Sequence, residues 1–452
     1  MHLLAINWAE IGVKAAQLIL SFSILVVLHE LGHFLPARWF GCRVEKFYLF
    51  FNPWFSLYKK KIGETEYGLG WIPFGGYVKI SGMIDESMDT EQMKQPAQPW
   101  EFRSKPAWQR LIIMLGGVTV NVLLALVIFT GIAYKWGDTY LPPQNLHYGI
   151  AADSLAQSMG LRDGDIITHV GGKPVEDELQ VPGLIVTKEA TQVTVLRDGQ
   201  PVQLPVPEGM ISSLNSAKRA SFIGIRHLAI VDTFTENSNA YKAGIREHDT
   251  VTSVDGTPIT YFHEFRRIVS ERAGKTVQVG VKRAGQNLVI PVPVAAIEGR
   301  GAIGVYPPPL DSMGFEIKTR HYTFAQSLPA GLHRAKNTLS MYTTGIKQLF
   351  TGKANPNDSL GSIFSFGKIF PGQWDWKSFW SLTALFSIIL AFMNVLPIPG
   401  LDGGHALFTL YEMITGRKPG DKFMEYAQIV GFVLLISLMI YALGLDVWRM
   451  FK

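Results

Sequence analysis

Charged residues are absent from four stretches of the chain, which are residues 15–28, 111–133, 378–401 and 426–445. A helix needs about 20 apolar residues to cross a hydrocarbon core of about 30 Å. The last three stretches reach that length, and the first reaches it only by continuing through ionisable residues to Pro36. The pattern therefore predicts four transmembrane helices, the first with ionisable side chains inside it.

Basic residues indicate how these helices are oriented. The segment 37–106 carries ten Lys and Arg residues, whereas residues 1–10 carry none, and three more follow the third stretch as Arg417, Lys418 and Lys422. Because cytoplasmic loops are enriched in Lys and Arg, both basic segments are expected in the cytoplasm. The long segment between the second and third helices is then expected outside, together with the N-terminus.

That long segment contains an internal repeat. Residues 156–175 and 240–259 are 84 positions apart and identical at eight of twenty positions. A period of this length is too long for a solenoid unit and suits two copies of a small domain. In each copy we expect a strand (165–170 and 249–254), a Gly-x-Pro turn and a closing hairpin, with a helix at 261–272 in the second copy.

The shared pattern A-x-x-x-G-[LI]-R-x-x-D-x-[IV]-x-x-V-x-G-x-P resembles PDZ domains of bacterial membrane-associated proteases. Such domains offer a sheet edge and a backbone pocket to an extended peptide. Whether these two copies grip a peptide or act as bulky size filters stays open. After them, apolar residues recur at spacings of three and four from Leu328 to Leu349, which predicts a helix that packs on the core or lies at the membrane interface.

Composition and charge argue against a disulfide and against binding to nucleic acid. The single cysteine, Cys42, excludes an intrachain disulfide, and the net charge of +5 is too small to indicate a partner. No basic stretch interleaved with aromatic residues suggests binding to nucleic acid. The N-terminus lacks a basic region before its apolar run and a small-residue cleavage site, so we expect a retained helix rather than a signal peptide.

The most specific motif is His29-Glu30-Leu31-Gly32-His33, inside the first apolar stretch. Two histidines at positions i and i+4 point from one face of a helix and can hold one zinc ion, and the glutamate beside them can act as a general base. Three ionisable side chains at membrane depth are costly, at about 2.5 kcal/mol or more each, and indicate function rather than packing.

A catalytic zinc ion usually has three protein ligands and one open position. Asp402 is the only acidic residue between Asp375 and Glu412, and it follows the two prolines that end the third apolar stretch. Considered alone, it would be an interfacial aspartate that caps the following helix. However, the first and third helices are expected to run in the same direction, which places Asp402 at the depth of His29 and His33. We therefore expect Asp402 to be the third ligand.

Together these motifs resemble the site-2 protease family. The resemblance rests on His-Glu-x-x-His in the first helix and on Asn394-x-x-Pro-x-Pro-x-Leu-Asp402-Gly in a later one. The two PDZ-like copies are similar to the regulator-of-sigma-E protease branch. The resemblance implies zinc bound by His29, His33 and Asp402, with Glu30 as the general base. It also implies that Asn394 holds the substrate backbone or steadies the oxyanion.

Two further segments share this resemblance. Gly117-Val-Thr-Val-Asn121 resembles a Gly-x-x-x-Asn motif of the family's second helix. Residues 71–78 are similar to a β-hairpin that dips into the membrane near the active site, and an edge of that kind can pair with an unwound substrate strand. The resemblance thus implies that Asn121, Gly75 and Gly76 contact the substrate.

The expected fold is a multi-span α-helical membrane protein with two extracytoplasmic α/β PDZ-like domains and a membrane-associated β-hairpin. The expected function is an intramembrane zinc metalloprotease for regulated intramembrane proteolysis. The resemblance implies a bacterial inner-membrane location with periplasmic PDZ domains, an active site towards the cytoplasm, and membrane-spanning substrates such as anti-sigma factors and remnant signal peptides. The rival hypotheses are a PDZ scaffold that stores or passes metal, for which Glu30 would be dispensable, and an inactive substrate binder.

The expected domains are the first transmembrane helix (1–36), a cytoplasmic segment with the β-hairpin (37–106), the second transmembrane helix (107–136), the PDZ-like domains (137–208 and 220–308), an extracytoplasmic amphipathic linker (309–376), the third transmembrane helix (377–402), a cytoplasmic loop (403–425), and the fourth transmembrane helix with the C-terminus (426–452).

Overall fold

The computed structural model describes residues 8–83, 95–215, 222–297 and 299–450. The first residues of the segment 1–36, Lys94 in the basic segment 37–106 and the last two residues of the segment 426–452 lie outside the described residues. The chain divides into two compact units. One contains Met1–Gly137, His321–Lys347 and Leu360–Lys452, and the other contains Asp138–Arg320 and Gln348–Ser359.

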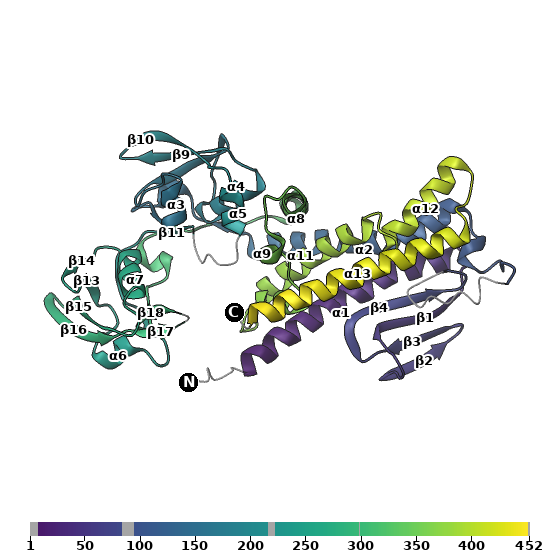
Figure 1. Ribbon diagram of the computed structural model, residues 1–452, viewed down its shortest axis with the longest axis horizontal. Helices are drawn as coiled ribbons and strands as arrows, with labels where there is room; N and C mark the ends of the chain where they lie inside the picture. The colour runs from purple at the N-terminus through teal and green to yellow at the C-terminus, as the bar shows by residue number, and fades with distance from the viewer. Residues whose placement is uncertain (1–7, 84–94, 216–221, 298, 451–452) are drawn as a thin grey trace. The chain divides into compact units, whose positions relative to one another are not determined.

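The first unit is built on four helices that are long and apolar enough to cross a membrane, as predicted (Figure 1). They are α1 (Trp8–Trp39), α2 (Ala107–Trp136), α11 (Trp376–Val395) and α13 (Asp421–Met450). α2 packs against both α1 and α11. It therefore joins α1 to α11.

Glycine residues allow α1 and α2 to approach closely. A Cβ atom built on Gly32 would lie 2.5 Å from the carbonyl oxygen of Gly116, and one on Gly116 would clash with the carbonyl oxygen of Gly32. Small residues at such a contact let two helix backbones pack directly, which drives helix association where water is absent. The contact lies between His29 and His33 in sequence, so it brings the histidine-bearing face of α1 against α2.

Hydrogen bonds between buried polar side chains fix α11 against the other two helices. The hydroxyl groups of Ser21 in α1 and Thr383 in α11 are 2.9 Å apart. Ser387 of α11 donates to the backbone carbonyl of Asn121 in α2, at 2.7 Å. Between helices in a membrane each such bond stabilises the packing by about 0.6–2 kcal/mol. The register of the three helices is therefore set by specific bonds as well as by shape.

A four-stranded sheet follows α1. Its strands are β1 (Val44–Phe51), β2 (Tyr58–Ile62), β3 (Thr65–Leu69) and β4 (Ile72–Ile80), in the order β2-β3-β1-β4. The predicted hairpin at 71–78 is thus one edge strand, β4, which contacts α1. A Cβ atom on Gly76 would lie 2.6 Å from a methyl group of Val26, so the glycine lets β4 lie directly against the helix.

In the described part of the chain, three further α-helices belong to this unit, and one of them lies in a segment that was expected to be a loop. α8 (Phe324–Phe350) covers the predicted amphipathic stretch, and Gly331 in it lies against the backbone of Thr130 in α2, which favours the packing interpretation. α10 (Ile363–Ile369) follows. The segment 403–425, expected as a loop, instead contains the helix α12 (Asp402–Thr415), which ends at Gly416 in the left-handed conformation.

The second unit contains the two copies of the repeat. Each copy has a four-stranded sheet with the same connectivity. The strand order is β10-β9-β7-β8 in the first copy and, read in the same direction, β16-β15-β13-β14 in the second. The predicted strands are β7 (Ile166–Val170) and β13 (Thr250–Val254), and the predicted helix is α7 (Phe262–Ser270). The hairpins are β9 (Gln192–Arg197) with β10 (Gln200–Pro205), and β15 (Thr276–Arg283) with β16 (Gln286–Pro293).

Shorter elements complete this unit. They are β5 (Asp138–Tyr140), β6 (Ile150–Ala152), α3 (Ser154–Ser158), β8 (Lys173–Pro174), α4 (Val181–Thr187), α5 (Met210–Asn215), β11 (Ile223–Ile225), β12 (Thr233–Phe234), α6 (Asn239–Ala243), β14 (Thr257–Pro258), β17 (Ala295–Ile297), β18 (Arg300–Ala302), β19 (Val305–Tyr306), β20 (Lys318–Arg320) and α9 (Pro356–Ser359). β11 falls in the range expected for the second copy but pairs with β6 of the first.

Equivalent ion pairs explain some of the identities in the repeat. Asp165 in the first copy and Asp249 in the second are both buried, and each accepts two hydrogen bonds from the guanidinium group of an arginine on the closing hairpin, Arg197 or Arg283. Burial raises the pKa of Asp249, but its hydrogen bonds to Arg283 and Arg246 outweigh burial and lower that pKa below its ordinary value. The shared aspartates are thus structural.

Candidate metal centre

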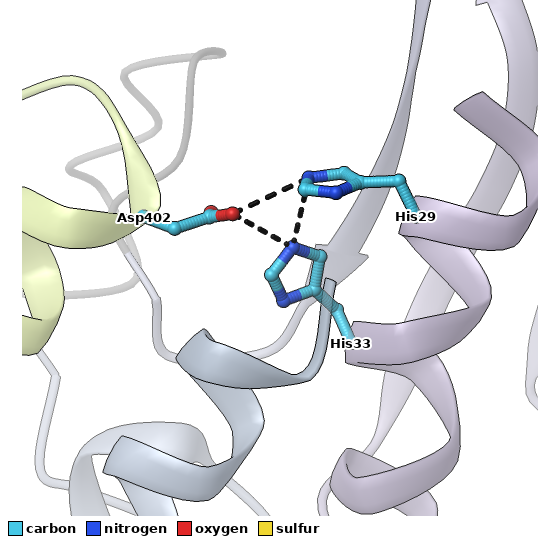
Figure 2. Close-up of side chains that lie close together, drawn as sticks. All are labelled: His29, His33 and Asp402. Carbon is cyan, nitrogen blue, oxygen red and sulfur yellow. Dashed lines mark hydrogen bonds and ion pairs between the residues drawn. The ribbon is translucent and has the colours of Figure 1, made fainter. Parts of the chain in front are cut away.

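Three potential metal ligands meet between α1 and the start of α12. His29 and His33 lie one turn apart on the same face of α1, and Asp402 is the first residue of α12 (Figure 2). The Nε2 atoms of the two histidines are 3.3 Å apart, and each is 3.3 Å from Oδ2 of Asp402. The three residues that the sequence predicted as ligands are therefore brought together.

This triangle fits a zinc ion. Donors about 2.0–2.1 Å from a tetrahedral zinc ion lie about 3.3 Å from one another, which is the spacing observed. Among the described residues, the buried Oδ2 atom of Asp402 has no hydrogen-bond partner, and the two imidazole nitrogens contact it only at ion-pair distance. A buried carboxylate oxygen left in this way is costly unless it is paired or binds a metal. Two nitrogens and one oxygen also match a catalytic zinc site with a fourth position open.

The turn before α12 places Asp402. α11 ends at Val395, because Pro397 and Pro399 prevent the helix from continuing. The chain then folds back, so that a Cβ atom on Gly403 would lie 2.5 Å from the carbonyl oxygen of Val395. Glycine is required for this close approach of backbone to backbone.

A partly buried ion pair holds α12 to α2. The guanidinium group of Arg110, at the start of α2, donates to the carboxylate of Glu412 in α12 at 2.5 Å. This pair is not predictable from the sequence, because an arginine and a glutamate 302 positions apart carry no local signal.

The other ring nitrogen of each histidine contacts α2. Nδ1 of His33 lies 2.8 Å from the backbone carbonyl of Ile113, to which it can only donate. The proton on Nδ1 leaves the lone pair of Nε2 free to face the centre. Nδ1 of His29 lies 3.0 Å from the side-chain amide of Asn121. Both imidazole rings are thus oriented by the helix behind them.

The predicted general base and substrate-binding residues lie around this triangle. Glu30 follows His29, and the backbone N–H of Val78 in β4 donates to its carboxylate. Asn394 lies near the end of α11. Its amide nitrogen is 3.4 Å from Nε2 of His29, the ring nitrogen that also faces His33 and Asp402. Gly75 and Gly76 lie on β4, whereas Asn121 is buried behind His29. The contact between the N–H of Val78 and Glu30 could not be predicted, because every residue except proline has a backbone N–H.

Gly117 of α2 lies directly against both imidazole rings. A Cβ atom built on it would clash with Nε2 of His33 and lie 2.6 Å and 2.7 Å from Cε1 and Nδ1 of His29. We expect Gly117→Ala to push both rings from their positions and to lower zinc affinity roughly 10-fold or more. Gly131→Ala on the same helix is the control, since nothing lies within 4 Å of its Cβ position. Competition with a chromophoric chelator measures both, and equal zinc affinity in the two variants would contradict this packing.

A family model and two relatives each match almost the whole chain. The model of peptidase family M50 matches residues 17–438. The regulator of sigma-E protease RseP of Escherichia coli is 28% identical over 455 residues, covering 96% of this chain and 98% of that protein. A Neisseria meningitidis protein named "Putative zinc metalloprotease" is 29% identical over 453 residues, with the same two shares. The PDZ domain of an SdrC-like protein from Listeria monocytogenes is 21% identical, covers 19% of this chain and 90% of that chain, and has a TM-score of 0.15.

Proposed function

The chain belongs to peptidase family M50 and is a zinc metalloprotease of regulated intramembrane proteolysis, and we propose that it hydrolyses peptide bonds within the transmembrane segments of its substrates. This membership confirms the resemblance to site-2 proteases. The observation that carries the proposal is the triangle of His29, His33 and Asp402, with Glu30 beside it, among helices apolar enough to cross a membrane.

We assign the three corners of the triangle as zinc ligands. A zinc ion bound there supplies a Lewis acid that polarises the scissile carbonyl and makes water a stronger nucleophile near neutral pH. His33 is held for this role by the carbonyl of Ile113, and Asp402 by the turn and ion pair that position α12. The carboxylate of Asp402 also offsets part of the positive charge that would otherwise be buried.

Glu30 is assigned as the general base. Its carboxylate takes a proton from the attacking water as the new C–O bond forms, and passes that proton to the leaving nitrogen as the C–N bond breaks. The N–H of Val78 holds the carboxylate in place. We assign the amide N–H of Asn394 to donate to the oxygen that becomes negative, or to the substrate backbone beside it.

The substrate is proposed to unwind before it is cut, because helical hydrogen bonds shield the peptide bond. β4 is an edge strand, and a substrate strand can add to such an edge. Gly75 and Gly76 would then leave the edge accessible. The N–H of Val78 already binds Glu30, so pairing would have to involve other donors of β4.

The remaining assignments concern placement and substrates. We propose the bacterial inner membrane, with segments 37–106 and 403–425 in the cytoplasm and the repeat in the periplasm as two PDZ domains near 137–208 and 220–308. The segments 1–36, 107–136, 377–402 and 426–452 are proposed to span the membrane, and 309–376 to link the repeat to it. We propose anti-sigma factors as substrates, and remnant signal peptides as a second class, as the family resemblance implies. Two relatives carry the name "Regulator of sigma-E protease RseP", which fits a role in sigma-E regulation.

Removal of the metal tests the proposal. We expect a chelator to abolish cleavage of a single-span substrate in detergent, and stoichiometric zinc to restore it, whereas Mg²⁺ should not, because it prefers an all-oxygen octahedral site. Zinc should also raise the melting temperature, since it binds only the folded chain. Full cleavage by protein that has been shown to be free of zinc would contradict the proposal.

A further inference from the structure

A buried amide lies directly behind one of the proposed zinc ligands. The Asn121 side chain is fully buried, with its amide nitrogen Nδ2 3.0 Å from Nδ1 of His29. Its amide oxygen, Oδ1, has no hydrogen-bond partner among the described residues. Its backbone carbonyl accepts the hydrogen bond from Ser387, so this point of α2 is also tied to α11. Asn121 therefore lies where the three helices of the site are joined.

The two nitrogens of His29 face different neighbours. Nε2 faces His33 and Asp402, each at 3.3 Å, and Nδ1 faces Asn121. A neutral imidazole carries one proton, and the nitrogen that binds a metal must have a free lone pair. When Nε2 binds zinc, the proton must therefore be on Nδ1, and its neighbour must be an acceptor.

The amide orientation in the structure corresponds to the other tautomer. With Nδ2 donating to Nδ1, a neutral ring carries its proton on Nε2. Rotation of the amide by 180° exchanges its oxygen and nitrogen without moving the backbone, and the two atoms are distinguished only by their hydrogen bonds. That rotation would place Oδ1, now unpaired, where it accepts from Nδ1–H.

We infer that Asn121 is a positioning residue for His29, accepting a hydrogen bond from Nδ1–H in the zinc-bound protein and so selecting the tautomer whose Nε2 binds the metal. This inference rests on the proposed function and gives Asn121 a different role from the contact with substrate that the family resemblance implies. A side chain with no exposed surface, on the Nδ1 side of the ring, is placed to hold the ligand rather than to reach a substrate.

Zinc affinity of the full chain in detergent, measured by competition with a chelator, tests the inference. We expect Asn121→Leu, which has a similar volume and no acceptor, to bind zinc roughly 10–100-fold more weakly. Asn121→Ala, which lacks the acceptor without adding bulk, should lose affinity in the same way. Asn121→Asp keeps an oxygen facing Nδ1 and should bind within a few-fold of the wild type. Thr119→Val is the control, because this exposed hydroxyl on the same helix donates to the carbonyl of Leu115, within its own helix.

A spectroscopic signature separates this role from simple support of the fold. Cobalt-substituted Asn121→Leu should show a visible absorption spectrum that differs from the wild type, while Asn121→Asp and Thr119→Val should match the wild type more closely. Equal zinc affinity in wild type and Asn121→Leu, with only KM changed, would overturn the inference and favour substrate contact. An equal loss in Asn121→Asp and Asn121→Leu would overturn it too. If wild type itself bound no zinc, the proposed function would fall together with the inference.

Discussion

Glu30→Gln is expected to bind zinc like the wild type and to lose essentially all cleavage. Glutamine is isosteric with glutamate and can still accept the N–H of Val78 through its oxygen. It has no basic carboxylate, so nothing at this position can take the proton from water and return it to the leaving nitrogen. General base catalysis typically contributes about 10²–10⁴-fold in rate, and we expect a loss in this range or larger.

The measurement pairs zinc content with initial cleavage rates on one protein preparation. Glu10→Gln serves as the matched control, because Glu10 lies near the N-terminal end of the same helix and pairs with Lys14. It should change neither quantity. Cleavage by Glu30→Gln at a rate near that of the wild type would remove the general base from the mechanism and would favour the metal-handling scaffold.

Asp402→Asn is expected to lose the metal itself. The variant keeps the shape of the side chain, but a neutral amide is a far weaker zinc ligand than a carboxylate, and the positive charge of the ion would be left without compensation in a buried site. We expect zinc affinity to fall by at least about 100-fold, and cleavage to fall with it.

Asp375→Asn is the control for this change. Asp375 caps the N-terminus of α11 by accepting a hydrogen bond from the backbone N–H of Ser378, whereas Asp402 follows the C-terminal end of that helix. Asparagine caps helices about as well as aspartate. Zinc affinity and cleavage should therefore be unaffected. If Asp402→Asn retained one tightly bound zinc ion per chain, Asp402 would not be a ligand, and the third ligand would have to be sought elsewhere.

The parts of the fold that depend on local sequence pattern were predictable. An uninterrupted apolar run of 20 or more residues satisfies its backbone hydrogen bonds in a bilayer by forming a helix, so the helices α2 and α13 could be located from hydropathy alone. The repeat was equally readable, since its shared glycines and aspartates set turns and buried ion pairs in each copy. The three candidate ligands were predictable because ionisable residues at membrane depth are rare.

Other features depend on contacts that the sequence does not encode locally. The strand order β2-β3-β1-β4 and the position of β4 against α1 follow from tertiary packing, not from any period in residues 44–80. Ile113 and Val78 act through backbone atoms, which every residue possesses. The segment that contains α12 was expected as a cytoplasmic loop because Arg417, Lys418 and Lys422 lie between two apolar stretches. The ion pair of Arg110 with Glu412, which holds α12 to α2, joins residues that are far apart in the sequence.

The position of the cut in a substrate tests the central claim most directly. A single-span model substrate with polar flanks, incubated with wild type and with Glu30→Gln in detergent, yields fragments whose masses locate the hydrolysed bond. We predict a cut inside the apolar span for the wild type and no fragments for the variant. Fragments that end only in the polar flanks, or the same fragments from both proteins, would contradict the account of a zinc protease acting within the membrane.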